Sequence, residues 1–392
     1  MRAIRFLHIA SFTGNIGDNI SHLGFRAWLK GLSKLDLTFI DLEIRQFFWK
    51  QSHWDDDLVR YVNSFDAVII GGGNYFELWD SASPTGTSIG IPQYLWSRIS
   101  VPVFFNALGL DPNQGASPMA VKRFRSFLDY ILGRPDWLVS LRNDGAISNL
   151  TSLFGGVYYQ RVHEAPDNAF HARSISTECS AIPEYRQRSS CQYLAINVAC
   201  DMAARRYAGY ASGYQGFAEE FSSSLASITE LHPELRLVFV PHIYSDLRAI
   251  SDIIECMPDQ LRRQRVDVAC YGSGDNAALA TMRTYAGAVM SLSMRFHANI
   301  IPIIGGVEVL GLACYPQITD FYRCIDMSDR CISVSAPGFR EEVVAKSTSI
   351  LSGNAHASLT PQVQALRRAK QLADKLTPFV LDWLKLIDIA VA

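Results

Sequence analysis

The chain has 392 residues, more than one compact core usually holds, so we expect two domains of about 150–200 residues each. A hydrophobic content of 48% with 19% charged residues is typical of a folded globular protein and excludes a disordered one. The net charge of −2, without a long run of Lys or Arg, argues against nucleic-acid binding as the main activity.

The N-terminus and the cysteines favour a cytoplasmic protein. The first stretch, MRAIRFLHIASFTGN, is too short and too interrupted for a signal peptide, and no segment reaches the ~18 apolar residues that span a bilayer. The eight cysteines lie between Cys179 and Cys331 without a CxxC pair. This spacing predicts neither a metal site nor a disulfide framework, and we expect most of these thiols to be buried.

Short apolar runs alternate with amphipathic ones through the first half of the chain. The runs expected to form strands are 3–10, 35–42, 66–73, 101–110 and 137–144, and the expected helices are 20–32, 55–65 and 117–132. This alternation predicts a parallel sheet with helices on both faces. The polar, aperiodic stretch 171–191 is interpreted as a linker between domains.

The same alternation resumes after the linker. The expected strands are 193–199, 235–242, 265–272, 287–293 and 307–315, and the expected helices are 214–231, 245–257 and 275–286. We therefore expect an N-terminal Rossmann-like domain at 1–175, a C-terminal one at 190–350 and helices at 360–392 that pack on the body.

The tail carries a helical stripe of apolar residues, and Thr377–Pro378 is expected to start a second helix because proline suits the first helical position. Packing against the body is the favoured interpretation of the stripe, and contact with a membrane surface is the alternative. The stripe consists of Leu372, Leu376, Val380, Leu384 and Ile387.

Ligands of open α/β sheets bind beyond the carboxyl ends of the strands, and four polar stretches fall at such ends. The first is TGNIGDNI, residues 13–20, which contains Asn15, Gly17 and Asp18. Its glycines let the backbone approach a ligand, and the following helix offers free N–H groups, although Asp18 could equally cap that helix. The GxxG spacing matches neither a dinucleotide fingerprint nor a P-loop.

Two further stretches follow strands of the first domain. GGGNYFELWD, residues 71–80, brings Gly72, Gly73 and Asn74 either against a ligand or into a tight turn. In LRNDGA, residues 141–146, Arg142 either holds a carboxylate in the cleft or forms an ion pair with an aspartate.

The fourth stretch is SMRFHANII, residues 293–301, where a buried strand ending at Ser293 leads into a helix. Arg295 and His297 are expected at the N-terminus of that helix, where anions are favoured. Arginine binds phosphate or carboxylate in a planar, bidentate way, and histidine donates protons near neutral pH. His242, with Asp246 nearby, follows a neighbouring strand and is a weaker candidate for the same site.

In this order, the four stretches resemble the polysaccharide pyruvyl transferase family over roughly residues 5–320. The family shows Gly-Asn-x-Gly-Asp after its first strand, here 14–18, and three glycines after a hydrophobic strand, here 71–73. It also shows an Arg-Asp turn, a Pro-Asp pair, here Pro166–Asp167, and Arg-[Leu/Phe]-His, here 295–297. The chain departs from the family pattern at Asn143, Ala146, Glu308 and Gln317.

The resemblance implies an α/β fold of two Rossmann-like domains, similar to glycosyltransferase B, with a C-terminal helical tail. It implies transfer of the carboxyvinyl group of phosphoenolpyruvate to two sugar hydroxyls, with release of phosphate and no metal or redox cofactor. His297 is then the candidate general acid and Asp18 the candidate base. Arg295, His297, Ser293 and His242 would bind the donor, and Asn15, Gly17, Gly72, Gly73, Asn74 and Arg142 would line the acceptor side or the cleft.

The expected partners are a small-molecule donor and a sugar acceptor, with no nucleic acid. Membrane contact is expected at most through a lipid-linked acceptor, and an oligomer is possible. Tyr75, Phe76, Trp79 and Trp96 could stack on sugars or pack in the core. Two alternatives stay open, namely a nucleotide-sugar glycosyltransferase with Arg295 on the pyrophosphate, and a non-catalytic sugar-binding protein.

Overall fold

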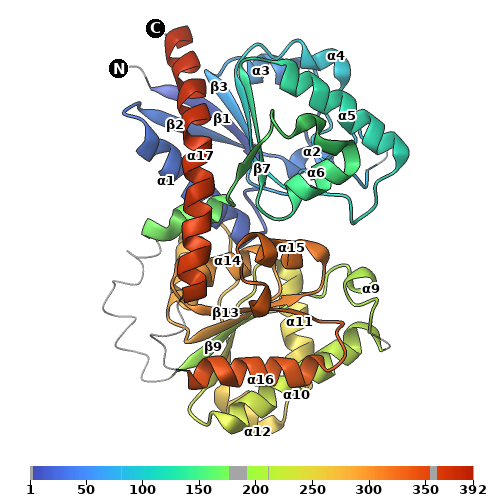
Figure 1. The fold of residues 1–392 in the computed structure, drawn as a ribbon, viewed down its shortest axis with the longest axis vertical. Coiled ribbons are helices and arrows are strands. Elements are labelled where there is room, and N and C mark those ends of the chain that lie inside the picture. The colour runs from blue at the N-terminus through green and yellow to red at the C-terminus, as the bar shows by residue number, and fades with distance from the viewer. Residues whose placement is uncertain (1–2, 81, 176–191, 211, 354–359, 392) are drawn as a thin grey trace. The chain divides into compact units, whose positions relative to one another are not determined.

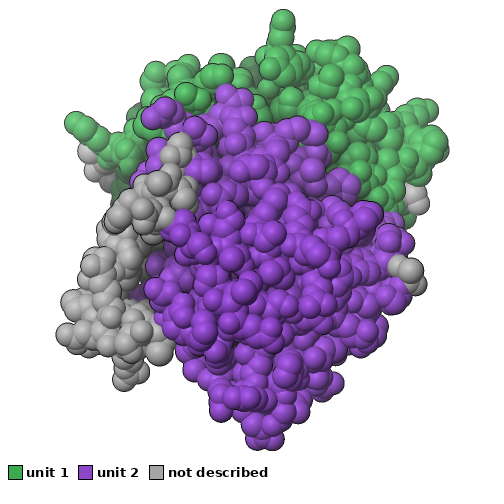
Figure 2. Space-filling view, turned by 60° about the horizontal axis from the view of Figure 1, so that its bottom comes forward, with its two compact units in different colours: residues 1–12, 25–168, 369–392 green, residues 13–24, 169–368 purple. Residues whose placement is uncertain are grey.

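The computed structural model describes residues 3–80, 82–175, 192–210, 212–353 and 360–391. The chain divides into two compact units, each assembled from separate segments of sequence (Figure 2). Unit 1 contains Met1–Phe12, Phe25–Asn168 and Ala369–Ala392, and unit 2 contains Thr13–Gly24 and Ala169–Arg368.

Unit 1 is built on a six-stranded parallel sheet with the order β2-β1-β3-β5-β7-β8 (Figure 1). Every residue of β3, β5 and β7 is buried, because helices cover both faces of a parallel sheet. The strands are β1 (Ile4–Ala10), β2 (Leu37–Glu43), β3 (Ala67–Gly71), β5 (Val103–Leu108), β7 (Trp137–Arg142) and β8 (His163–Ala165).

Alternate residues of these strands pack into two separate cores. Phe104 belongs to the core that includes Phe25 and Trp383, whereas Phe105 belongs to the core that includes Phe124 and Phe127. The helices of unit 1 include α1 (Ile16–Leu32), whose first residues belong to unit 2, and the main part of α17 (Thr360–Val391). The others are α2 (Arg45–Phe48), α3 (Asp56–Val62), α4 (Gln93–Trp96), α5 (Pro118–Gly133) and α6 (Ala146–Phe154), with a 3₁₀ turn at Gly155–Tyr158. A second 3₁₀ turn, Asn168–Ala172, begins at the last residue of this segment of unit 1 and continues into unit 2.

The expected strand 101–110 is interrupted by an irregularity in its pairing with β7. The register shifts between Phe105 and Leu108, and Ala107 has a left-handed φ of 46°. The chain then forms β6 (Leu110–Asp111), which pairs with β4 (Phe76–Glu77) in a separate two-stranded sheet.

Unit 2 repeats the architecture with a six-stranded parallel sheet of order β11-β10-β9-β12-β13-β14. The strands are β9 (Tyr193–Asn197), β10 (Arg236–Phe239), β11 (Val266–Val268), β12 (Met290–Ser293), β13 (Glu308–Ala313) and β14 (Cys331–Ser333). The helices are α9 (Ala203–Arg206), α10 (Gly213–Leu231), α11 (Tyr244–Glu255), α12 (Asp259–Arg265), α13 (Asp275–Ala286), α14 (Phe296–Ile304), α15 (Pro316–Cys324) and α16 (Phe339–Ser352), with a 3₁₀ turn at Ser328–Arg330.

The predicted boundaries treat each domain as one stretch of sequence, and the structure divides the chain differently. Residues 13–24 lie within the predicted domain 1–175 but belong to unit 2. The reason is a set of contacts with later segments, such as the backbone hydrogen bond from Ile16 N to His242 O at 3.1 Å. Most of the proposed linker, 176–191, falls outside the described residues.

The apolar stripe of the tail is buried, and Leu376, Val380, Leu384 and Ile387 pack in the core of unit 1 with β1 residues. The expectation of a second helix starting at Thr377–Pro378 is wrong, because α17 continues through Pro378. Apolar packing on both sides of the proline outweighs the hydrogen bond that it cannot donate.

The six described cysteines are free thiols, but the expectation that most are buried is wrong, since among them only Cys314 is buried. None of the described helices combines the length and apolar character that a bilayer-crossing segment needs.

Candidate functional site

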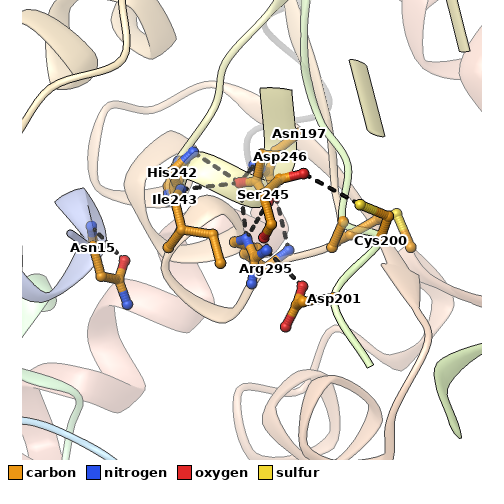
Figure 3. A network of polar contacts seen from close by, with 12 residues as sticks. Asn15, Asn197, Cys200, Asp201, His242, Ile243, Ser245, Asp246 and Arg295 are labelled. Atoms are coloured by element: carbon orange, nitrogen blue, oxygen red, sulfur yellow. Dashed lines mark hydrogen bonds and ion pairs between the residues drawn. The ribbon is translucent and has the colours of Figure 1, made fainter. Parts of the chain in front are cut away.

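The candidate site lies at the carboxyl edge of the sheet of unit 2. Strands β10, β9 and β12 are neighbours in this sheet and run parallel, so their carboxyl ends meet at one edge. The segments that leave these ends carry Asp246, Asp201 and Arg295, which form a network of charged side chains (Figure 3).

Asp246 is the fixed centre of this network. Its carboxylate is fully buried and accepts hydrogen bonds from the backbone N–H groups of His242 at 2.8 Å and Ile243 at 3.2 Å. Asn197 Nδ2 approaches the same oxygen at 3.5 Å. Because these donors lie immediately before α11 and at the end of β9, the carboxylate is positioned by the fold itself.

Arg295 is held along one edge of its guanidinium by this carboxylate. Its Nε lies 2.8 Å from both oxygens of Asp246, its Nη2 also contacts Asp246, and Nη2 donates to Asp201 Oδ1 at 2.7 Å. Burial opposes the positive charge, but the two carboxylates raise the pKa of Arg295 above its ordinary value. The sequence predicts Arg295 as a binder of the donor anion, and the structure shows protein carboxylates on this edge.

Asp201 joins Arg295 to a second arginine that the sequence analysis missed. Asp201 Oδ2 accepts from Arg206 Nη2 at 2.9 Å, and the Arg206 guanidinium lies 4.6 Å above the centre of the Tyr315 ring. Burial acts to raise the pKa of Asp201, but the attraction of Arg295 and Arg206 outweighs it and lowers that pKa. Asp201 therefore carries its charge between two cations.

His297 meets the segment after the first strand. Its Nδ1 lies 3.7 Å from Asp18 Oδ1, and both side chains are largely buried. A β-carbon at Gly17 would lie 2.6 Å from both Cβ and Nδ1 of His297, closer than real contacts allow. The glycine of the first polar stretch is thus required by the ring of the histidine, and Asp18 is the side chain beside it.

Backbone and polar contacts fix residues 13–24 to unit 2. Gly14 N donates to Ser273 Oγ at 3.1 Å, and Gly274 N donates to Asn19 Oδ1 at 3.1 Å. Asn15 Oδ1 accepts from Gly17 N at 3.1 Å, which is a local turn contact. The predicted cleft residues Asn15 and Gly17 and the candidate base Asp18 therefore belong to the same unit as the predicted donor residues.

Two predicted donor-binding residues are fully buried. His242 Nε2 lies 2.9 Å from Tyr285 Oη, and burial first, then Arg295 and His297, lower the pKa of His242 well below its ordinary value. Ser293 Oγ donates to Ala298 O at 2.8 Å and so ties β12 to α14. Both side chains are therefore occupied by contacts inside the protein, behind the edge of the sheet.

The remaining predicted residues lie in unit 1. Gly71 and Gly72 have φ values of 142° and 87°, which favour glycine, and the ring of Tyr75 occupies the space of a β-carbon at Gly73. Asn74 Nδ2 donates to Glu77 Oε1 at 3.1 Å. These contacts match the tight-turn alternative for this stretch.

Arg142 forms ion pairs with aspartates, which is one of the two possibilities that the sequence left open. It is 3% exposed and pairs with Asp144 at 2.8 Å and with Asp167 at 3.2 Å. Asn143, a departure from the family pattern, accepts from Asp167 N at 2.9 Å. The Arg-Asp turn and the Pro-Asp pair are thus two halves of one buried cluster.

The structure also shows where the proposed stacking residues and Glu308 lie. Among the proposed stacking residues, Tyr75, Phe76 and Trp96 are buried in the core and Trp79 is exposed. Glu308 pairs with Arg330 at 2.9 Å at the amino end of β13, away from the carboxyl edge. The sequence analysis missed Asn197, the last residue of β9, and Asp201, which follows that strand. The rule that selected Arg295, a polar residue at the carboxyl end of a strand, would also have selected these two.

The family model of polysaccharide pyruvyl transferase matches residues 15–315. A search of curated proteins found no match. Among solved structures, UDP-GlcNAc 2-epimerase from Neisseria meningitidis has a TM-score of 0.57 at 10% identity, covering 95% of this chain and 99% of that one. α,α-Trehalose 6-phosphate synthase from Burkholderia multivorans has a TM-score of 0.55 at 8% identity, covering 100% and 98%.

Identities this low show the fold alone. The neighbours have folds of the glycosyltransferase B type, and this confirms the expected class of two Rossmann-like domains.

Proposed function

Because the chain belongs to the polysaccharide pyruvyl transferase family, we propose that it transfers the carboxyvinyl group of phosphoenolpyruvate to two hydroxyls of a sugar. The products would be a pyruvate ketal on a glycan or glycan precursor and inorganic phosphate. One observation carries the proposal furthest. Asp18, from the Gly-Asn-x-Gly-Asp segment, and His297, from the Arg-[Leu/Phe]-His motif, meet in one buried contact at 3.7 Å.

The proposed reaction needs a proton donor at carbon 3 of phosphoenolpyruvate. His297 would give that proton, and the cationic centre at carbon 2 would be stabilised by the adjoining ester oxygen. Since the His297 side chain is 7% exposed, water has little access to this centre before the acceptor attacks.

Two acceptor hydroxyls would then replace the double bond and the phosphate ester at carbon 2. Asp18 is our candidate to take the proton of the first hydroxyl, and its contact with His297 gives a route to restore the acid. The second hydroxyl displaces phosphate, which leaves with the remaining proton. The equation balances without water or a redox partner, and we propose, as the family resemblance implies, that the reaction uses no metal or redox cofactor.

The donor anion is proposed to bind at the start of α14. Arg295 is the N-cap residue, and the first turn offers backbone N–H groups and the positive end of the helix dipole. We also propose a cytoplasmic location, because the described free thiols suit a reducing compartment.

The test combines the purified protein, phosphoenolpyruvate and a panel of glycosides and lipid-linked saccharides. We expect acceptor-dependent phosphate release together with a new ketal methyl signal by NMR. His297→Gln should lower turnover by about a hundredfold or more while phosphoenolpyruvate still binds. His53→Gln, at an exposed histidine, is the matched control.

Other results would support other functions. Turnover of a UDP-sugar, with none of phosphoenolpyruvate, would favour the nucleotide-sugar glycosyltransferase. Sugar binding without any turnover would favour a non-catalytic protein. Full phosphoenolpyruvate activity in His297→Gln would remove the histidine from the mechanism.

A further inference from the structure

Asp201 occupies the space between two arginines at the carboxyl edge of unit 2. Its Oδ1 accepts from Arg295 Nη2 at 2.7 Å and its Oδ2 accepts from Arg206 Nη2 at 2.9 Å. One carboxylate bridging two guanidiniums is the arrangement that such arginines adopt around a bound carboxylate or phosphate.

The two carboxylates that neutralise Arg295 differ in how firmly the fold holds them. Asp246 has no exposed side-chain surface and accepts two backbone hydrogen bonds from the start of α11. The Asp201 side chain is 27% exposed, and within the described part of the chain its side-chain partners are the two arginines. Asp201 is therefore the member of the network that can leave at the lower cost.

The backbone conformation next to Asp201 also indicates that this residue can move away from the arginines. Met202, the next residue, has a left-handed φ of 53° and is 44% exposed. A non-glycine residue in this region is strained, and such residues cluster at active sites, ligand clamps and switch regions.

Arg206 and Arg295 are both held in place by groups other than Asp201. Arg295 keeps its contacts with Asp246, while Arg206 lies over the Tyr315 ring and donates to Cys314 Sγ at 3.5 Å. Among the described residues, Arg206 Nε has no hydrogen-bond partner although the side chain is 10% exposed. Both guanidiniums would stay in place if Asp201 moved away, and one of them retains a donor to offer.

We propose that Asp201 is the internal occupant of an anion site formed by Arg206 and Arg295, and that an anionic group of the donor binds there by displacing it. Arg206 is then a second donor-binding arginine. The identity of the anion as a phosphate or carboxylate of phosphoenolpyruvate rests on the proposed function. The exchange of one anion for another keeps the two buried cations neutralised in both states.

The test is the binding of inorganic phosphate and of phosphoenolpyruvate to Asp201→Asn, measured by calorimetry. Removing the competing charge should lower the dissociation constant of both ligands by about tenfold, and Arg206→Ala should raise it by at least about tenfold. The free Asp201→Asn protein should also melt at a lower temperature than wild type, and phosphate should restore it.

Two neighbouring residues serve as controls. Asp252 has a similar side-chain exposure of 30% and pairs with Arg248 rather than with this network, so Asp252→Asn should leave both constants unchanged. Arg205, the exposed neighbour of Arg206 on α9, should tolerate alanine without effect on anion binding.

The inference is wrong if Asp201→Asn binds the anions no more tightly than wild type and if phosphate does not restore its melting temperature. Asp201 would then be a structural partner of Arg295. If Asp201→Asn does not fold, unchanged phosphate binding in Arg206→Ala overturns it equally. Tighter phosphate binding without phosphoenolpyruvate turnover would support the anion site and count against the proposed donor. If the protein turns over phosphoenolpyruvate but neither Asp201→Asn nor Arg206→Ala changes the dissociation constants, the proposed function is supported and the proposed anion site is wrong.

Discussion

Gly17 has only a hydrogen atom where His297 comes closest to α1. We predict that Gly17→Ala lowers turnover by about tenfold or more, because the new β-carbon would lie 2.6 Å from the imidazole and force the ring to move. Steady-state kinetics with phosphoenolpyruvate would show the loss mainly in kcat, since the donor anion is bound by other groups.

The same helix provides a control for this substitution. Gly31 also lies in α1, and a β-carbon there would have no heavy atom within 4 Å. Gly31→Ala should keep full activity and stabilise the protein by about 0.5–1 kcal/mol, since alanine favours a helix. An equal loss of activity in both variants would show that the effect comes from α1 as a whole and not from the ring.

His242 gives the protein a predictable sensitivity to acid. Burial lowers the pKa of this histidine well below its ordinary value, so the folded state keeps it neutral while the unfolded state protonates it near pH 6.5. Between these two pKa values the unfolded state binds more protons, and stability falls as the pH falls. The loss from this one group is at most about 1.4 kcal/mol per pH unit.

Thermal unfolding at pH 8 and pH 5.5 tests this prediction. His242→Gln should lower the melting temperature at pH 8 but narrow the difference between the two pH values. His53→Gln, on the surface, should leave that difference unchanged. A difference as wide in His242→Gln as in wild type would show that other groups cause the acid sensitivity.

The chemistry-bearing residues of unit 2 were partly predictable from sequence. A strand end followed by a helix start points to Arg295 and His297, because every parallel sheet presents its carboxyl ends to ligands. Sequence could not show that Asp246 and Asp201 already contact Arg295, since those residues come from other strands. The full burial of His242 and Ser293 was equally hidden, because polar residues at a strand end can face either way.

At the scale of elements, α17 shows how packing overrides a local signal. Pro378 lacks the N–H that would donate to the carbonyl of Asp374, yet the helix continues from Thr360 to Val391. Leu376 and Val380, on either side of the proline, are both buried in unit 1. The apolar stripe was readable from the sequence, but the energy gained by burying it was not.

We predict that Pro378→Ala stabilises unit 1 by roughly 1–3 kcal/mol, because alanine restores a hydrogen bond in the interior of a helix. Urea unfolding of the two proteins would measure the difference. Pro361, at the start of the same helix, is the control, since proline is tolerated in the first turn and Pro361→Ala should change stability little. A destabilised Pro378→Ala would mean that the surrounding packing requires the proline geometry.

The whole molecule departs from the sequence prediction in how the units are assembled. Alternating strands and helices were sufficient to predict two parallel sheets, because that pattern has few solutions. The pattern carries no signal that residues 13–24 belong to unit 2, or that the tail from Ala369 belongs to unit 1. Such assignments depend on contacts between distant segments, among them the hydrogen bond from Ile16 N to His242 O.

Because unit 2 is built from two separate segments of the chain, its stability can be tested with fragments. A fragment of residues 169–368 contains every strand of the second sheet but lacks residues 13–24, which supply Asp18 and several backbone contacts to unit 2. We expect it to melt at a lower temperature than a version that carries 13–24 fused through a flexible linker. The contacts that the fusion restores include the hydrogen bonds of Gly14 with Ser273 and of Gly274 with Asn19.

Calorimetric melting of the two fragments, followed by phosphate binding, would test this expectation. A fused segment in which Gly17 is replaced by leucine is the matched control, because a bulky side chain cannot lie against His297 and should reverse the gain. Equal stability of the fragment with and without 13–24 would mean that unit 2 is complete without the segment. The proposed pairing of Asp18 with His297 would then depend on contacts that do not stabilise the fold, and the role of Asp18 as the base would lose its structural support.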